Sequence, residues 1–149
     1  MADHLPLSML IELAQGKLDE AGRALSEAIA QQRHAKSQLD TLDTYRADYA
    51  VRLQQATEGG VSASNYHNFR RFIATLDDAI SQQNRILAQI DTKIQIGQQH
   101  WYVEKRRLNS YETLKSRQDQ QMRYRETRRE QRASDEISAG LYRRSRQPH

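Results

Sequence analysis

The side chains that most often carry out chemistry are scattered along this sequence. The five histidines are His4, His34, His67, His100 and His149. No two of them are four residues apart, and no cysteine is present to complete a metal site. Asp77 and Asp78 form a carboxylate pair on a predicted helix surface without a companion base. Gly59-Gly60 is not followed by the Lys-Ser/Thr of a phosphate-binding loop. We therefore predict no catalytic residue, metal site or cofactor, and a protein that is not an enzyme.

The composition favours a coiled coil over a compact fold. Hydrophobic residues make up 37% and charged residues 28% of the 149 residues, and the mean hydropathy is −0.94. A spherical interior needs more apolar side chains than this, whereas two paired helices need only a narrow stripe. The absence of cysteine excludes disulfides and fits a reducing compartment. We find no signal peptide and no apolar run long enough to span a membrane.

One break divides the sequence, at residues 57–65. Gly59 and Gly60 tolerate positive φ angles and reverse a chain easily. Ser62, Ser64 and Asn65 are candidate caps of a following helix. Helical periodicity lies on both sides of this break, so we predict a hairpin of two long helices.

Both flanking segments carry a seam with steps of three and four residues, which is the spacing of a coiled coil. The first seam runs through Ile11, Ala14, Leu18, Ala21, Leu25, Ala28, Gln32, Ala35, Leu39, Leu42, Arg46, Tyr49, Leu53 and Ala56. The second runs through Phe69, Ile73, Leu76, Ile80, Gln83, Leu87, Ile90, Ile94, Gly97, Trp101, Glu104, Leu108 and Tyr111. The short break makes antiparallel pairing the simple outcome.

The register follows from the volume of each core layer. Pairing residues whose numbers sum to 122 places a large residue opposite a small one in five layers. These layers are Ala14/Leu108, Ala21/Trp101, Leu25/Gly97, Ala28/Ile94 and Ala35/Leu87. A slip of one heptad, with a sum of 129, would place Arg46 against Gln83 and stays open. We prefer 122 because Gly97 within a helix is then explained by the facing Leu25.

The C-terminal third differs in charge. Residues 1–104 hold 10 basic and 13 acidic side chains, whereas residues 105–149 hold 13 basic and 6 acidic ones. We predict one all-α domain over residues 1–149: a helix over about 5–57, a loop over 57–65, a helix over about 65–137 that overhangs its partner, and a disordered basic tail from about 138 to 149. The basic residues indicate either a solvated helix end or docking onto an acidic protein surface or nucleic acid.

One face near the break is unusually apolar. If Ile11 occupies heptad position a, then Tyr45, Phe72, Ala79 and Ile86 all occupy g positions, where charged side chains are usual. The opposite e positions carry mainly charged or polar residues. A single such residue would only widen the core seam, but the set predicts an exposed patch used by a partner.

The whole pattern resembles the FliJ family of flagellar export proteins, over nearly the whole chain. The strongest marks are Asn65-Tyr66-His67-Asn68-Phe69 and the segment from Phe72-Ile73-Ala74 to Asp78-Ala79-Ile80. Five further segments also match the family: Tyr45-Arg46-Ala47-Asp48-Tyr49, the glycine loop, the heptads of residues 18–42, Trp101 with Lys105-Arg106-Arg107, and residues 131–136. Their order and spacing are more specific than any one coiled-coil segment.

The resemblance implies an antiparallel coil similar to the central stalk of rotary ATPases. It implies a cytoplasmic protein, peripheral at the inner membrane through its partners, which are the hexameric export ATPase, the membrane export gate and export chaperones. The gate-binding surface carries over onto Gln38, Leu42, Tyr45, Tyr49, Phe72, Leu76, Ala79 and Gln83. Gln83 stands where the family pattern has histidine.

The ATPase would be contacted by the N-terminus and the basic helix end, where ring assembly would be promoted. We assign this contact to Lys115, Arg117, Arg123, Arg125, Arg128 and Arg129. Two alternatives stay open: an adaptor of a non-flagellar type III secretion system, and a nucleic-acid-binding rod. Tyr124 and Tyr142 are too few to support base stacking by the tail, and no small-molecule substrate is predicted.

Overall fold

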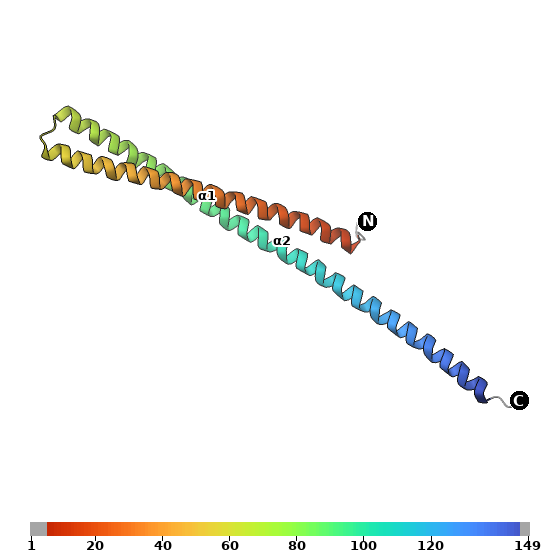
Figure 1. Cartoon of the computed structure of the whole chain (residues 1–149). Coiled ribbons are helices and arrows are strands. Elements are labelled where there is room, and N and C mark those ends of the chain that lie inside the picture. Colours follow the sequence, from red (N-terminus) through yellow and green to blue (C-terminus); the bar gives the residue numbers. More distant parts are fainter. Residues whose placement is uncertain (1–5, 147–149) are drawn as a thin grey trace, which may run out of the picture. The chain divides into compact units, whose positions relative to one another are not determined.

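The computed structural model describes residues 6–146, and these residues form two long helices. Helix α1 spans Leu7–Glu58 and helix α2 spans Ala63–Arg146, and the described residues contain no strand. The predicted all-α antiparallel hairpin is confirmed: α1 and α2 lie side by side where they leave the connecting loop (Figure 1). Neither helix contains a stretch apolar and long enough to span a membrane.

The helices form two compact units, which we treat separately. The hairpin unit is Leu18–Glu104 and contains the loop. The open unit is the described part of residues 1–17 together with that of residues 105–149.

The chain reversal is built by a glycine cap followed by a serine cap. Gly60 has a φ of 80°, and its N–H donates to the Thr57 carbonyl at 3.3 Å. The Val61 N–H donates to the Ala56 carbonyl at 2.9 Å, which completes the Schellman arrangement at the end of α1. Ser62 Oγ then accepts the Asn65 N–H at 3.3 Å and caps α2. Both predicted features of the break, the glycine reversal and a serine cap, are confirmed.

Cross-helix contacts establish the register of the hairpin unit. A Cβ placed on Gly97 would lie 3.5 Å from Leu25 Cδ1 and 3.9 Å from Leu25 Cα. Farther toward the loop, Arg46 Nε lies 2.7 Å from Asp77 Oδ1. Gln83 reaches Ala35 and Gln38, so it does not face Arg46. The register with a sum of 122 is therefore the observed one, and the slipped register is wrong.

The core of the hairpin unit is thin and rich in alanine. Ala21, Ala28 and Ala35 of α1 are buried, whereas the larger α2 residues of the same layers are half-buried. Leu76 is the buried large residue nearest the loop. In the open unit Ala14 and Leu108, which form one predicted layer, are both buried. Small residues on one helix let the two backbones approach closely.

Helix α2 is longer than predicted. It continues through Gly140 to Arg146, rather than ending at about residue 137 before a disordered segment. Every residue from Glu112 to Ala139 is exposed, so this part has no packing partner within the open unit. Helix α1 begins at Leu7 rather than at about residue 5. The predicted features at Leu5, His4, His149 and the rest of residues 147–149 lie outside the described residues.

Candidate partner-binding surfaces

An aromatic cluster lies on one side of the hairpin unit near the loop. The ring centroids of Tyr49 and Phe72 are 4.3 Å apart, and those of Tyr49 and Phe69 are 6.3 Å apart. The Arg52 guanidinium carbon lies 5.3 Å from the centre of the Tyr49 ring, within the range of a cation–π contact. Tyr45 is 54% exposed and Phe72 is 42% exposed. The structure therefore gathers side chains from both helices into one exposed aromatic surface.

The eight residues predicted to meet the export gate differ in accessibility. Gln38, Tyr45 and Phe72 are exposed, and Leu42, Tyr49, Ala79 and Gln83 are half-buried. Leu76 is only 7% exposed, so its side chain supports the surface from the core. We call the accessible seven, together with Phe69, Arg52 and Ile86, the aromatic patch.

Gln83 has a structural task within this region. Its amide nitrogen donates to the Ala35 carbonyl at 3.0 Å and to Gln38 Oε1 at 3.1 Å. The first bond joins the side chain to the backbone of the other helix, and the second orients Gln38 within the aromatic patch. Gln83 therefore positions Gln38, independently of any contact that Gln83 itself makes with a partner protein.

Prediction from the sequence missed Arg52 and Phe69 as members of the patch. Arg52 lies seven residues after Tyr45, which is two helical turns, so the heptad pattern already placed both on the same side. Phe69 had been assigned to the core seam only. It is half-buried, and its ring contact with Tyr49 extends the patch toward the loop.

The opposite side of the hairpin unit is polar near the loop. Arg46 and Asp77 form an ion pair at 2.7 Å. The hydrogen bond that Arg46 Nε donates to Asp77 Oδ1, and then the negative charge of Asp77, raise the pKa of Arg46 above the usual value for arginine. Gln32 also bonds to Asp91 across the two helices. These polar interactions join α1 and α2 on this side of the coil. The coil therefore has one polar side and one aromatic side.

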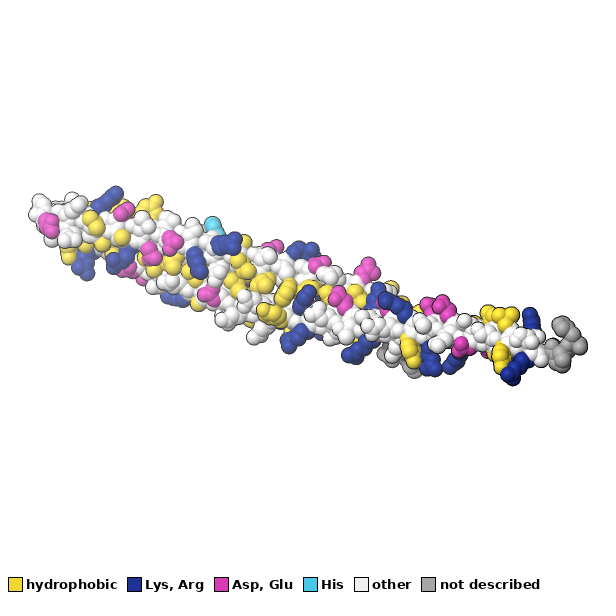
Figure 2. Space-filling view, turned by 60° about the horizontal axis from the view of Figure 1, so that its bottom comes forward, with side chains coloured by type: hydrophobic (Ala, Val, Ile, Leu, Met, Phe, Trp, Pro, Cys, Tyr) yellow, Lys and Arg dark blue, Asp and Glu magenta, His cyan; other side chains and the backbone are white. Residues whose placement is uncertain are grey.

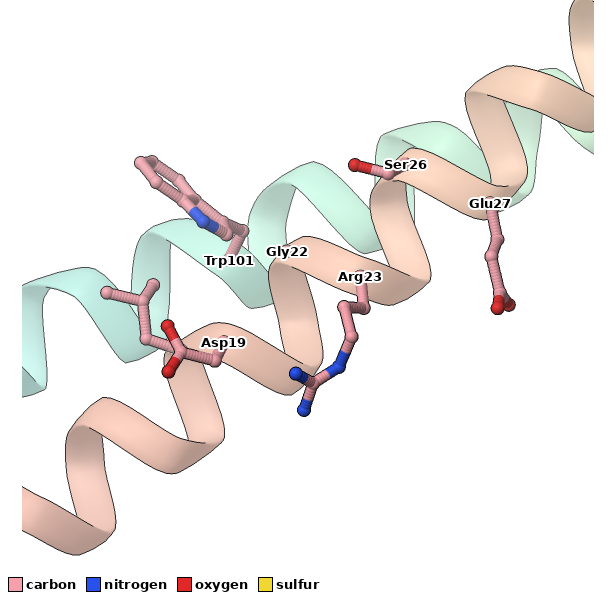
Figure 3. Close-up of a pocket in the computed structure, with 7 residues that line it drawn as sticks. Asp19, Gly22, Arg23, Ser26, Glu27 and Trp101 are labelled. Carbon is pink, nitrogen blue, oxygen red and sulfur yellow. The ribbon is translucent and has the colours of Figure 1, made fainter.

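A hollow lies farther from the loop on the hairpin unit, beside Trp101 (Figure 3). The indole nitrogen of Trp101 would lie 3.7 Å from a Cβ placed on Gly22. The ring therefore leans over Gly22, although Ala21 is the residue of the same core layer. The only tryptophan of the chain is half-exposed at this point.

The six basic residues assigned to the ATPase contact are all exposed, but they do not share one face. Arg117 and Arg128 are eleven residues apart, close to three full turns, so they lie in line with Arg106. Asp119 is two residues from Arg117 and therefore projects from the opposite side. Its heptad neighbours continue an acidic line, which consists of Glu112, Asp119 and Glu126, with Glu130 beside them.

Two of the six predicted basic residues belong to the acidic side. Lys115 and Arg123 each lie four residues from Asp119, and residues four apart on a helix are neighbours. Arg125 belongs to the other side with Arg117 and Arg128, and Arg129, the sixth residue, lies between the two sides. We call Arg106, Arg117, Arg125, Arg128 and Arg132 the arginine face. Figure 2 shows basic and acidic side chains following α2 toward its C-terminal end.

Comparison with known proteins gives these surfaces a context. Residues 3–147 match the family model described as Flagellar FliJ protein. The chain belongs to the FliJ family. It is 32% identical over 138 residues to the Flagellar FliJ protein of Escherichia coli strain K12, an alignment that covers 93% of this chain and 94% of that protein. The Flagellar FliJ protein of Salmonella typhi gives the same identity and coverage.

A solved structure shows the same fold. The structure of a putative YscO homologue from Chlamydia trachomatis superposes with a TM-score of 0.64 and covers 95% of this chain and 93% of that chain, at 14% identity. Membership of the FliJ family makes this chain a component of flagellar protein export. The resemblance inferred from the sequence motifs is confirmed.

Proposed function

We propose that this FliJ protein is a stalk-like component that binds the hexameric export ATPase, promotes assembly of its ring and couples it to the membrane export gate. Export chaperones would be further partners, and the protein would work in the cytoplasm, peripheral to the inner membrane through these partners. The observation that carries the proposal is that each unit carries a surface of a different kind. The aromatic patch lies near the loop of the hairpin unit, whereas the arginine face lies on α2 in the open unit.

The aromatic patch supports the contact with the export gate. Tyrosine, phenylalanine and arginine are enriched at protein interfaces, and the two aromatic rings bury large areas with few rotatable bonds. The stack of Tyr49 on Phe72 holds both rings in place before any partner arrives. Less ordering is then needed on binding, which favours affinity.

The arginine face supports the contact with the ATPase. The unpaired part of α2 offers guanidinium groups along one side, where an acidic protein surface would be attracted over a long contact. Lys115 and Arg123 lie among carboxylates, so we now assign them a smaller share of this contact than Arg117, Arg125 and Arg128.

The deciding experiment measures the ATPase with and without this protein. The cognate export ATPase should form rings and hydrolyse ATP faster in the presence of the full chain, as read by sedimentation and phosphate release. A truncation after Tyr111, which keeps the buried pair Ala14 and Leu108, should lose both effects. If neither the full chain nor the truncation changes ring formation or hydrolysis, the ATPase role is wrong.

A further inference from the structure

The aromatic patch widens the apolar stripe of α2 from two heptad positions to three. Between residues 69 and 90 the a and d positions form the seam with α1, and the g positions beside them are also apolar. These g residues are Phe72, Ala79 and Ile86. The e residues on the other side of the seam are all polar: Arg70, Asp77 and Asn84. A helix with one partner needs apolar a and d positions only, whereas the wider stripe is typical of a helix that packs against two others.

Cross-helix contacts show which α1 residues complete this surface. Lys93 Nζ donates a hydrogen bond to Gln31 Oε1 at 3.2 Å. Two heptads closer to the loop on both helices, the same pairing places Tyr45 opposite Ala79. Tyr45 is 54% exposed, Phe72 42% and Ile86 38%. Both helices therefore contribute to one exposed apolar surface that is continuous with the seam between them.

Ala79 is the low point of this surface. Phe72 and Ile86 each lie seven residues from it on the same side of α2, about 10 Å away along the helix. Tyr45 lies across from it on α1. A methyl group surrounded by three larger side chains forms a hole of the kind that receives a side chain from another helix in a coiled coil.

The backbone of the hairpin unit restricts what can cover the patch. The described residues contain no strand, so the unit offers no sheet edge to which an extended segment could add. An extended segment lying on aromatic rings would leave the N–H and C=O groups on its covered side without partners, which is costly. A helix satisfies these groups internally and can present a stripe of apolar side chains. The element that fits the patch is therefore an amphipathic helix.

The rim of the patch is nearly neutral. It consists of the c-position residues Thr41, Asp48, Thr75, Gln82 and Gln89. The hydroxyls of Thr41 and Thr75 each donate to a carbonyl of their own helix at 3.0 Å. Asp48 and Arg52, four residues apart on α1, contribute one charge of each sign. An occupant with polar flanks of low net charge suits this rim.

The widened stripe has a limited length. The g residue that follows Ile86 is Lys93, which is bonded to Gln31 instead of extending the apolar surface. At the loop end, the Arg52 guanidinium carbon lies 5.3 Å from the centre of the Tyr49 ring. Phe72 and Ile86 are 14 residues apart on α2, which corresponds to about 21 Å. The occupant therefore needs about four helical turns.

We propose that an amphipathic helix of the membrane export-gate protein packs on the aromatic patch as a third helix of the coil. A large apolar side chain of this helix sits over Ala79, between Phe72 and Ile86 and across from Tyr45. The inference rests on the proposed function, in which the gate is the partner of the patch, and it adds the form of the partner element, its length and the position of its central anchor.

Calorimetric titration of the gate protein into the full chain tests this docking mode. Ala79→Leu fills the hole between Phe72 and Ile86, so it should weaken binding by roughly tenfold or more. Ala88→Leu is the matched control, because it makes the same substitution at an exposed position that projects from nearly the opposite side of α2. Thermal melts verify that both variants fold. Binding of the wild type should change little with salt, because the rim is nearly neutral.

Synthetic peptides of the gate protein identify the occupant directly. Overlapping peptides from its sequence outside the membrane, each long enough for about five helical turns, are titrated into the full chain. One amphipathic peptide should bind, and the mixture should show more helical circular dichroism than the sum of its components. Proline at the centre of that peptide should weaken binding by roughly tenfold or more, because proline breaks a helix. The unmodified peptide should bind Ala79→Leu equally weakly.

Three results would overturn the proposal. The first is a folded Ala79→Leu variant that binds the gate as tightly as the wild type does. The second is a set of gate peptides of which none binds with a gain of helix. The third is a full chain that dimerises without the gate and becomes monomeric as Ala79→Leu, because the occupant would then be a second copy.

The variants also separate the docking mode from the proposed function. If Tyr45→Ala weakens gate binding and Ala79→Leu does not, the gate meets the patch without a third helix over Ala79, and the inference fails alone. If neither substitution changes gate binding, the contact between gate and patch fails with it.

Discussion

Gly97 of α2 packs directly against Leu25 of α1, with the Leu25 Cα atom only 3.9 Å from the place where a Cβ on Gly97 would lie. The backbones of the two helices are therefore close at this layer. The glycine is a packing residue of the coil, and the layer is sensitive to added volume.

Alanine and leucine at position 97 should have opposite effects on the stability of the protein. Alanine places its Cβ at ordinary contact distance from Leu25 and removes the cost of a helical glycine, so its melting temperature should equal or exceed that of the wild type. Leucine overpacks the layer, and the free energy of unfolding should fall by about 1–3 kcal/mol. Denaturant unfolding of both variants measures the difference. A Gly97→Leu variant more stable than the wild type would show that the layer is looser than the contacts with Leu25 indicate.

Substitutions in the aromatic patch should affect binding to the export gate and stability of the fold to different extents. Tyr45→Ala removes a ring that is 54% exposed, so affinity for the export gate should fall while the melting curve changes little. Leu76→Ala removes a buried side chain beneath the same region and should cost about 2–5 kcal/mol of stability. Phe72→Ala should do both in part, because Phe72 stacks on Tyr49. Calorimetric titration with the gate protein and thermal melts give the two readouts. Unchanged affinity for a folded Tyr45→Ala would remove the patch from the gate contact.

Binding to the ATPase should depend more on the arginine face than on the total number of basic residues on α2. Replacing Arg117 and Arg128 by glutamate puts negative charge on one side of α2 and should weaken binding to the ATPase strongly, with a loss of its salt dependence. Replacing Lys115 and Arg123 by glutamate makes the same change in net charge on the acidic side, and its effect should be several-fold smaller. Binding titrations at two salt concentrations compare the double variants. Equal losses in both would mean that only total charge counts.

The ion pair between Arg46 and Asp77 should contribute little to stability. Both side chains are about half-exposed, and solvent screens ion pairs at the surface, so Asp77→Asn should lower the unfolding free energy only slightly. Asp77 raises the pKa of Arg46 in the folded protein. Stability from a raised pKa is present at lower pH and is lost only as the pH rises through that pKa, which lies above the usual arginine value. Melts of wild type and Asp77→Asn should therefore run parallel through neutral and moderately alkaline pH. A gap that narrows near neutral pH would mean that another titrating group acts here.

Most of the hairpin unit could be predicted because its pattern is local and repetitive. The double glycine with Ser62 predicts the chain reversal. Pairing large residues with small ones selects the register, as Leu25 and Gly97 illustrate. The same layer rule placed Trp101 opposite Ala21. The direction in which its ring leans, over Gly22, depends on a rotamer choice that the spacing of residues does not encode.

The end of α2 was misjudged because Gly140 was taken as the end of the helix. A single glycine costs a helix about 1 kcal/mol, which good helix formers on both sides can offset. Arg143, Arg144 and Arg146 in the last turn also stabilise the negative end of the helix dipole. The basic residues were likewise counted by charge rather than by face, so Lys115 and Arg123 were grouped with side chains from which they project away.

The alanines of the first helix also determine which helices can pair. Ala21, Ala28 and Ala35 make α1 the slender partner, and the observed register sets them against Trp101, Ile94 and Leu87 of α2. Two copies of α1 placed together would leave gaps at these alanine layers, and two copies of α2 would crowd their large side chains there. This difference in side-chain volume favours pairing of α1 with α2 and disfavours pairing of either helix with a second copy of itself.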